Sequence, residues 1–136
     1  MSEEIGFEVQ VSHPYQETLE LTKAALMDEG FGIMTSIDVQ ATMKEKLDID
    51  FRPYTILGAC NPPLAHRVLT EDAVTGLLLP CNVTVEAETD GSSIVRIANP
   101  EVILSVGSLR QNTEVSAVAQ EARQRLERVA EVLLKS

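Results

Sequence analysis

The segment from Tyr54 to Glu88 constrains the fold more than any other part of the chain. It opens with a nearly continuous apolar run, Tyr54 to Cys60, which is typical of a strand that is central in its sheet or buried on both faces. Asn61 followed by Pro62 then predicts the start of a helix, because asparagine caps free backbone N–H groups and proline needs no donor at the first helical position. The run from Leu77 to Glu88 predicts a further strand, with apolar and polar residues alternating from Cys81 onward.

The rest of the chain contains shorter patterns of the same two kinds. Alternating or apolar runs predict strands over residues 5–11, 31–37 and 94–98. A helix is expected from Pro14 until Gly30 stops it, and a short one after Asp38. An apolar stripe from Val115 to Leu133 predicts a long final helix. Residues 101–109 are apolar but interrupted by glycine, and no element is assigned to them. Three methionines in apolar patterns are expected in the core: Met27, Met34 and Met43.

These elements predict one α+β domain spanning residues 1–136, a length typical of a single compact domain. Without the two short helical excursions the order is β-α-β4-α. We therefore expect one mostly antiparallel five-stranded sheet with helices packed on one face.

The formal net charge of −10 excludes some classes of partner. Phosphate backbones and anionic lipid surfaces repel an acidic protein, so we expect neither nucleic-acid nor membrane binding. The first residues, Met1 to Glu4, lack the basic segment of a signal peptide, and no apolar run is long enough to span a bilayer. We expect a cytoplasmic protein, in which cysteines normally stay reduced.

Two Cys-Asn pairs carry a resemblance to a known family. Phe51 and Tyr54, then the sequence Ile-Leu-Gly-Ala-Cys-Asn-Pro at residues 56–62 and Leu-Leu-Pro-Cys-Asn-Val at residues 78–83, resemble the family called domain of unknown function 302. The resemblance implies a β-α-β4-α fold similar to that of the TATA-binding protein, often assembled as a dimer. It implies no activity, because none is established for that family.

The same Cys-Asn pairs define a candidate site. If strands 54–60 and 77–88 are antiparallel neighbours, Cys60 and Cys81 lie at one rim of the sheet, where their sulfur atoms can face one another. The helix that starts at Pro62 adds free N–H groups at this rim. We therefore predict a small-molecule site formed by Cys60, Asn61, Cys81 and Asn82. With His66, one turn into the helix, the two thiols would suit a soft metal ion.

Other interpretations of the cysteines remain open. Free cysteines often pack as small apolar groups. A thiol-dependent enzyme or redox sensor would require an accessible thiol of low pKa. A third alternative is a structural homodimer module without chemistry. Cys-x-x-Cys pairs, glycine-rich phosphate loops and Gly-x-Ser-x-Gly motifs are absent, so the sequence names no reaction and no cofactor.

Overall fold

The computed structural model describes residues 4–136, in which strands and helices alternate much as the sequence predicts. The first three residues, which carry most of the segment used to exclude a signal peptide, lie outside the described part. The strands are β1 (Gly6–Val11), β2 (Gly32–Asp38), β3 (Tyr54–Cys60), β4 (Cys81–Ala87) and β5 (Ser93–Ala98). The helices are α1 (Tyr15–Asp28), α2 (Val39–Leu47), α3 (Pro62–Glu71), α4 (Pro100–Ile103) and α5 (Thr113–Lys135), with 3₁₀ helices at Ala73–Leu78 and Gly107–Gln111.

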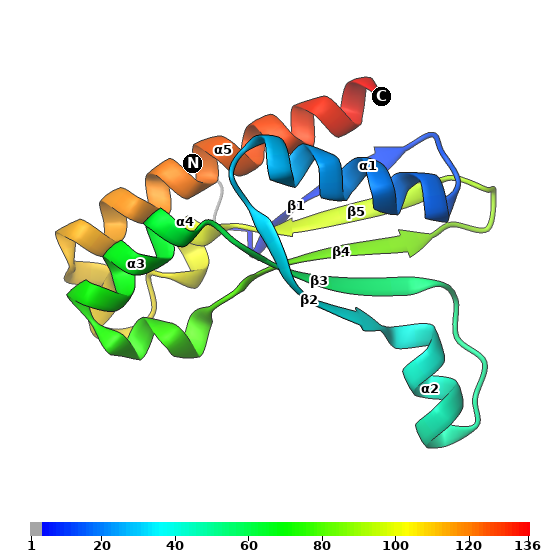
Figure 1. Cartoon of the computed structure of the whole chain (residues 1–136), viewed down its shortest axis with the longest axis horizontal. Helices are drawn as coiled ribbons and strands as arrows, with labels where there is room; N and C mark the ends of the chain where they lie inside the picture. Colours follow the sequence, from blue (N-terminus) through cyan, green and yellow to red (C-terminus); the bar gives the residue numbers. More distant parts are fainter. Residues whose placement is uncertain (1–3) are drawn as a thin grey trace.

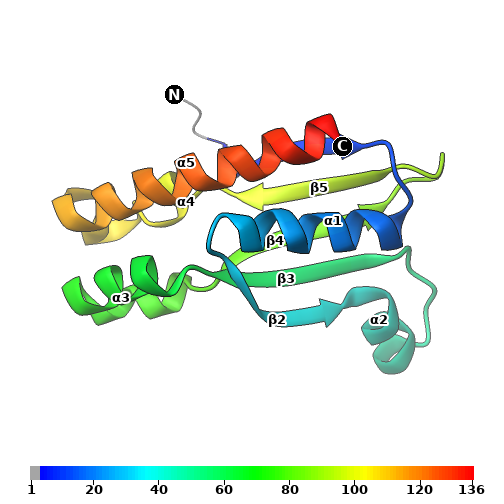
Figure 2. The same ribbon diagram turned by 45° about the horizontal axis from the view of Figure 1, so that its top comes forward.

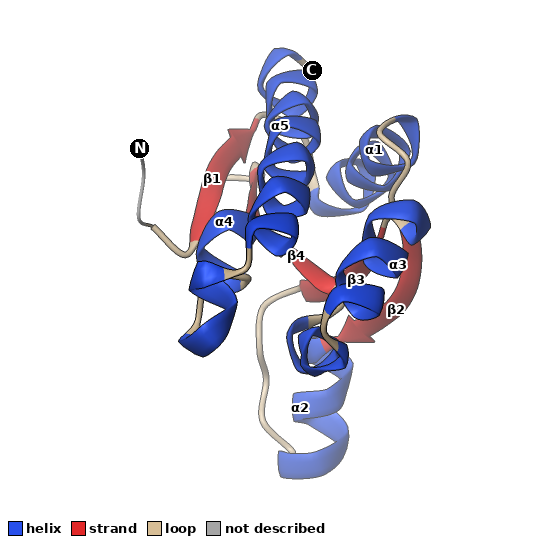
Figure 3. Cartoon of the chain, turned by 90° about the vertical axis from the view of Figure 1, so that its left-hand side faces the viewer, coloured by secondary structure: helices blue, strands red, loops and turns tan. Residues whose placement is uncertain are grey.

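The strands form one antiparallel sheet in the order β1-β5-β4-β3-β2. α1 and α5 both cover the same face of this sheet (Figure 1). They run side by side along the strands (Figure 2). The short helix α2 projects toward the other side of the sheet (Figure 3). The predicted α+β class, with helices on one face of a five-stranded antiparallel sheet, is confirmed.

The core lies between the sheet and these two helices because alternate strand residues point toward them. The strands bury Val9, Val11, Leu57, Val83, Val85, Val95 and Ile97. The predicted stripe of α5 faces them and buries Val115, Val118, Ala119, Ala122, Leu126, Val129 and Leu133. Each large aliphatic side chain removed from water in this way contributes about 1.5–3 kcal/mol.

Two stretches differ from the expectation. β4 begins at Cys81 rather than at Leu77, and Leu77 belongs to a 3₁₀ helix. The physical reason is Pro80, which has no N–H to donate to a neighbouring strand and therefore marks the first place where pairing begins. The unassigned residues after Asn99 form α4, capped by the Asn99 side chain, and a 3₁₀ turn whose Gly107 has a φ of +58°.

The expectation of three core methionines is wrong for two of them. Met27 and Met34 are 62% and 66% exposed, and Met43 is half-buried. Met34 lies on β2, the edge strand, and Met27 lies on the outer side of α1, so the apolar patterns that contain them face solvent here. The described residues include no helix that is long and apolar enough to cross a membrane.

Candidate functional site

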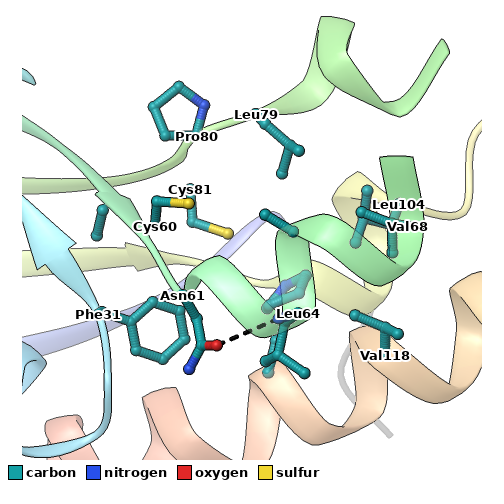
Figure 4. Close-up of a pocket in the computed structure, with 14 residues that line it drawn as sticks. Phe31, Cys60, Asn61, Leu64, Val68, Leu79, Pro80, Cys81, Leu104 and Val118 are labelled. Carbon is teal, nitrogen blue, oxygen red and sulfur yellow. Dashed lines mark hydrogen bonds between the residues drawn. The ribbon is translucent and has the colours of Figure 1, made fainter. Parts of the chain in front are cut away.

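A small apolar pocket lies where the ends of β3 and β4 meet α3 and α5 (Figure 4). Its cavity volume is about 30 Å³, whereas about 10–15 Å³ is enough to hold one water molecule. The accessible wall is apolar throughout. The lining residues are Phe31, Ala59, Cys60, Asn61, Leu64, Ala65, Val68, Leu79, Pro80, Cys81, Pro100, Leu104, Val118 and Ala122.

Asn61 builds the corner between β3 and α3. Its side-chain oxygen accepts a hydrogen bond from the N–H of Leu64 at 3.3 Å, which confirms the predicted cap. Its amide nitrogen donates to the backbone oxygen of Glu29, just after α1, at 3.5 Å. The side chain is buried and hydrogen-bonded at both ends, so it aligns α3 rather than offering free groups to a ligand.

Gly58 allows the segment before β4 to close over β3. A Cβ atom at this position would lie 2.7 Å from Pro80 Cγ and would overlap the hydroxyl of Thr35. The missing side chain therefore lets β2 and Pro80 approach β3 from two sides. Pro80 and Leu79 then form one wall of the pocket.

The two cysteines are free and line the same pocket, but they do not form a close pair. The expectation that the two sulfur atoms face one another is therefore wrong. The sheet register explains why, since Ala59 rather than Cys60 lies opposite Cys81. Cys60 is instead paired with Gly32 of β2. Because Cys60 is one residue beyond the partner of Cys81, the two side chains do not face one another across β3 and β4, although both border the pocket at this end of the strands.

Cys81 is in an environment that disfavours the thiolate. Burial, and to a smaller extent the neighbouring charge of an ionised Cys60, raise the pKa of the Cys81 thiol to about 11. The thiolate is the nucleophile and the metal ligand, so at neutral pH this sulfur acts as a small apolar group.

The structure separates His66 from the cysteines. His66 is exposed and lies in a shallow depression with Arg67, Thr70, Glu71 and Glu114. It points away from the pocket because α3 buries Leu64 and Val68, on the opposite side of the helix. Within residues 4–136 no group of three or more His, Cys, Asp or Glu residues is arranged to hold a metal ion. The predicted soft-metal triad of Cys60, Cys81 and His66 is therefore not assembled.

Asn82 is also apart from the pocket. It follows Cys81 on β4, so it points to the face of the sheet opposite α1 and α5. There it lines a larger groove with Tyr54, Thr84 and Arg96. The predicted four-residue site thus divides into a pocket with Cys60, Asn61 and Cys81, and a separate surface with Asn82.

Sequence patterns did not identify several pocket residues. Phe31 follows the glycine that ends α1, whereas Pro100 and Leu104 belong to the segment left unassigned. Val118 and Ala122 were expected only as part of the α5 core stripe. The Asn99-Pro100 pair, which repeats the Asn61-Pro62 helix start, was the one local signal that a second capped helix lies nearby.

The family described as "Domain of unknown function DUF302" matches residues 7–133, nearly the whole chain. The chain belongs to the DUF302 family. The match includes both Cys-Asn pairs and every strand except the first residue of β1.

A solved structure agrees with this assignment. The chain is similar to the uncharacterized conserved DUF302 protein from Bacillus stearothermophilus, with 29% identity and a TM-score of 0.83. The similarity covers 95% of this chain and 98% of that one. No curated protein matches the chain. Membership of the DUF302 family therefore identifies the fold and names no function.

Proposed function

We propose that this DUF302 chain is a binding module for a small apolar molecule, held in the pocket beside Cys60 and Cys81. The observation that supports this proposal is the wholly apolar pocket at the junction of sheet and helices. Such cavities stay dry and bind apolar molecules, since water inside them has no hydrogen-bond partner. Asn61 belongs to this proposal as the residue that aligns the pocket wall.

The size of the pocket limits what it binds without rearrangement. A space of about 30 Å³ holds only a very small guest, so a larger ligand requires α3 and the following 3₁₀ helix to move outward. The ion pairs on the outer side of α3 contribute little stability, because Arg67 contacts Glu114 and Glu121 of α5 through side chains that are 40–45% exposed. The 3₁₀ helix also exposes Leu77, at 83%.

The alternatives based on thiol and metal chemistry have less support. A redox or nucleophilic role would depend on Cys60 alone, because the raised pKa of Cys81 keeps that thiol protonated. A soft metal ion would lack a third ligand among the described residues.

Xenon is the first probe, since it occupies dry apolar cavities, and benzene tests whether α3 moves outward to admit a larger guest. We expect titration of ¹⁵N-labelled protein to shift the backbone signals of Leu64, Ala65 and Cys81. Ala65→Leu should fill the pocket and abolish these shifts. Ala117→Leu, at an exposed position of α5, is the matched control and should retain them. Shifts that persist in Ala65→Leu, or none in the parent, would overturn the proposal.

Homodimerisation is a second function, favoured by the arm formed by α2 and the loop that follows it, residues 39–52. α2 buries none of its residues, although an isolated helix of this length is only marginally stable in water. Met34, Ile37, Leu47 and Ile49, on and beside the arm, are between 46% and 66% exposed. Residues 39–52 are neutral within a chain of net charge −10, because three basic residues balance three acidic ones: Lys44, Lys46, Arg52, Glu45, Asp48 and Asp50. Asp38, the cap of α2, adds one negative charge beside them.

The occupant we propose for this surface is a second copy of the chain. Two copies that meet there experience little like-charge repulsion, although the chain carries a net charge of −10. A standard interface takes about 800 Å² per partner, roughly a tenth of the 7778 Å² surface of this chain. Sedimentation should show a dimer that Leu47→Asp dissociates and that Leu77→Asp, at the exposed 3₁₀ helix, leaves intact. A monomeric parent protein at micromolar concentration would exclude this function.

A further inference from the structure

The face of the sheet opposite α1 and α5 carries a groove that is separate from the cysteine pocket. The groove crosses β1, β5, β4 and β3 near α4, and its volume is about 550 Å³. Small-molecule sites usually measure about 300–1,000 Å³, so this groove is large enough for a ligand without rearrangement. We call it the open-face groove, lined among others by Glu8, Tyr54, Asn82, Thr84, Arg96 and Ile103.

Three polar side chains of the open-face groove have unused hydrogen-bonding capacity. Within residues 4–136, the Tyr54 hydroxyl and the Asn82 amide make no hydrogen bond. Thr84 Oγ1 is buried and also lacks a partner, the one such buried side-chain atom in the described chain. Buried polar groups in native proteins are nearly always hydrogen-bonded, so the Thr84 hydroxyl calls for an explanation such as an ordered water molecule. It is covered by its neighbours, and the contacts that we assign to a ligand are those of Tyr54 and Asn82.

The charges of the open-face groove are already paired. Arg96 Nε donates to Glu8 at 2.9 Å, and Arg96 Nη1 donates to Glu86. Glu86 also accepts from Arg52, on the loop before β3. Among the described residues that line the groove, an anionic ligand would therefore find no unpaired cation, and the acidic chain as a whole would repel it.

We propose that the open-face groove binds a neutral ring molecule that carries several hydroxyl groups, as a monosaccharide or the ribose of a nucleoside does. Hydroxyl groups both donate and accept hydrogen bonds, and so do the Asn82 amide and the Tyr54 hydroxyl. Ile103 and Ala98 supply an apolar surface for the C–H side of the ring. This site does not depend on the proposed function of the cysteine pocket.

The test is a titration of ¹⁵N-labelled protein with glucose, ribose and adenosine, beside glucose 6-phosphate. We expect at least one neutral compound to shift the signals of Asn82, Thr84 and Arg96 without moving those of Leu64 and Ala65. Binding of ribose and adenosine but not glucose would identify a nucleoside as the source of the hydroxyls, and binding of glucose would identify a saccharide.

Variants then test the assigned contacts. Asn82→Leu and Tyr54→Phe should each weaken binding by about threefold to tenfold, the effect of one hydrogen bond. Gln10→Leu, which removes an exposed amide on the same sheet face outside the groove, should leave affinity unchanged.

Three outcomes would overturn the proposal. They are the absence of shifts on β4 and β5 with all neutral probes, tighter binding of glucose 6-phosphate than of glucose, and shifts confined to the cysteine pocket. Failure of this proposal leaves the proposed function of the cysteine pocket intact, because that function is tested separately with xenon and benzene.

Discussion

The side chain of Asn61 connects the start of α3 to the carbonyl of Glu29, thirty-two residues earlier. Arg125 of α5 donates to the same carbonyl oxygen at 3.2 Å. One backbone group at the end of α1 therefore receives hydrogen bonds from the corner of the pocket and from the longest helix. This arrangement aligns three helices around the candidate site.

Replacement of Asn61 with alanine should therefore destabilise the fold. The variant loses the cap of α3 and the bond to Glu29, and we expect a loss of about 1–2 kcal/mol in the free energy of unfolding. Urea denaturation measures it. Asn112→Ala, which removes the cap of α5 away from the pocket, serves as the comparison for the loss of a helix cap alone. A loss of only a few tenths of a kcal/mol for Asn61→Ala would show that its hydrogen bonds contribute little.

Cys81 should react slowly with alkylating reagents. With its pKa raised to about 11, about one molecule in ten thousand carries the thiolate at pH 7. Mass spectrometry after iodoacetamide treatment should find Cys81 unmodified in the folded protein and fully modified in urea. In the Cys60→Ser variant Cys81 is the one remaining thiol, so all modification can be assigned to it. Fast modification of folded Cys81 near neutral pH would contradict the buried environment that the structure assigns to it.

Glu86 should make stability depend on pH in acid. Burial raises the pKa of Glu86, but hydrogen bonds and charge from Arg96 and Arg52 outweigh it and hold the pKa below the ordinary value near 4.5. A carboxyl group with a lowered folded-state pKa stabilises the fold above its unfolded-state pKa. That contribution is lost as the pH falls through the folded-state value.

The parent protein should therefore lose stability below about pH 4.5 more steeply than Glu86→Gln. At neutral pH the variant should be less stable by about 1–2 kcal/mol, a modest figure because both arginines are about half exposed. Urea denaturation at several pH values measures both effects. Glu8→Gln removes an exposed contact with Arg96 and should change the dependence of stability on pH less. If the parent and Glu86→Gln depend on pH in the same way, Glu86 does not have this role.

Thr84→Val should leave the free protein as stable or make it more stable, by up to about 1 kcal/mol. Valine has nearly the same shape, and the hydroxyl that it replaces is buried without a partner. Thermal denaturation without ligand checks the expectation. A clear loss of stability would reveal that the hydroxyl has a partner, such as an ordered water molecule.

Gly58→Ala should destabilise the protein by about 1–3 kcal/mol through overpacking. The added methyl group would press on Pro80 and Thr35, whereas Gly91→Ala adds a methyl group in open space and tests only the cost of a positive φ. If Thr35 is also shortened, in Gly58→Ala/Thr35→Ser, part of the loss should return. An unchanged unfolding midpoint for Gly58→Ala would mean that β2 and Pro80 move apart freely.

Local patterns predicted the elements and the fold class because both depend on neighbours in the chain. Alternation identified the strands, the stripe from Val115 to Leu133 identified α5, and the Asn61-Pro62 pair identified the start of α3. These signals arise from side-chain period and from backbone groups at helix ends, which a sequence displays directly. Only residues 101–109, where short helices leave no period, could not be assigned.

The composition of the site depended on tertiary structure. Whether Cys60 faces Cys81 is decided by the register of β3 against β4, and a shift of one residue reverses every side chain. The same register places Asn82 in the open-face groove, while the packing of α3 directs His66 to solvent. The sequence by itself determined which residues form strands and helices, because that choice is local. Tertiary structure alone decided which of their side chains meet, because contacts between distant segments depend on register and packing that no local pattern encodes.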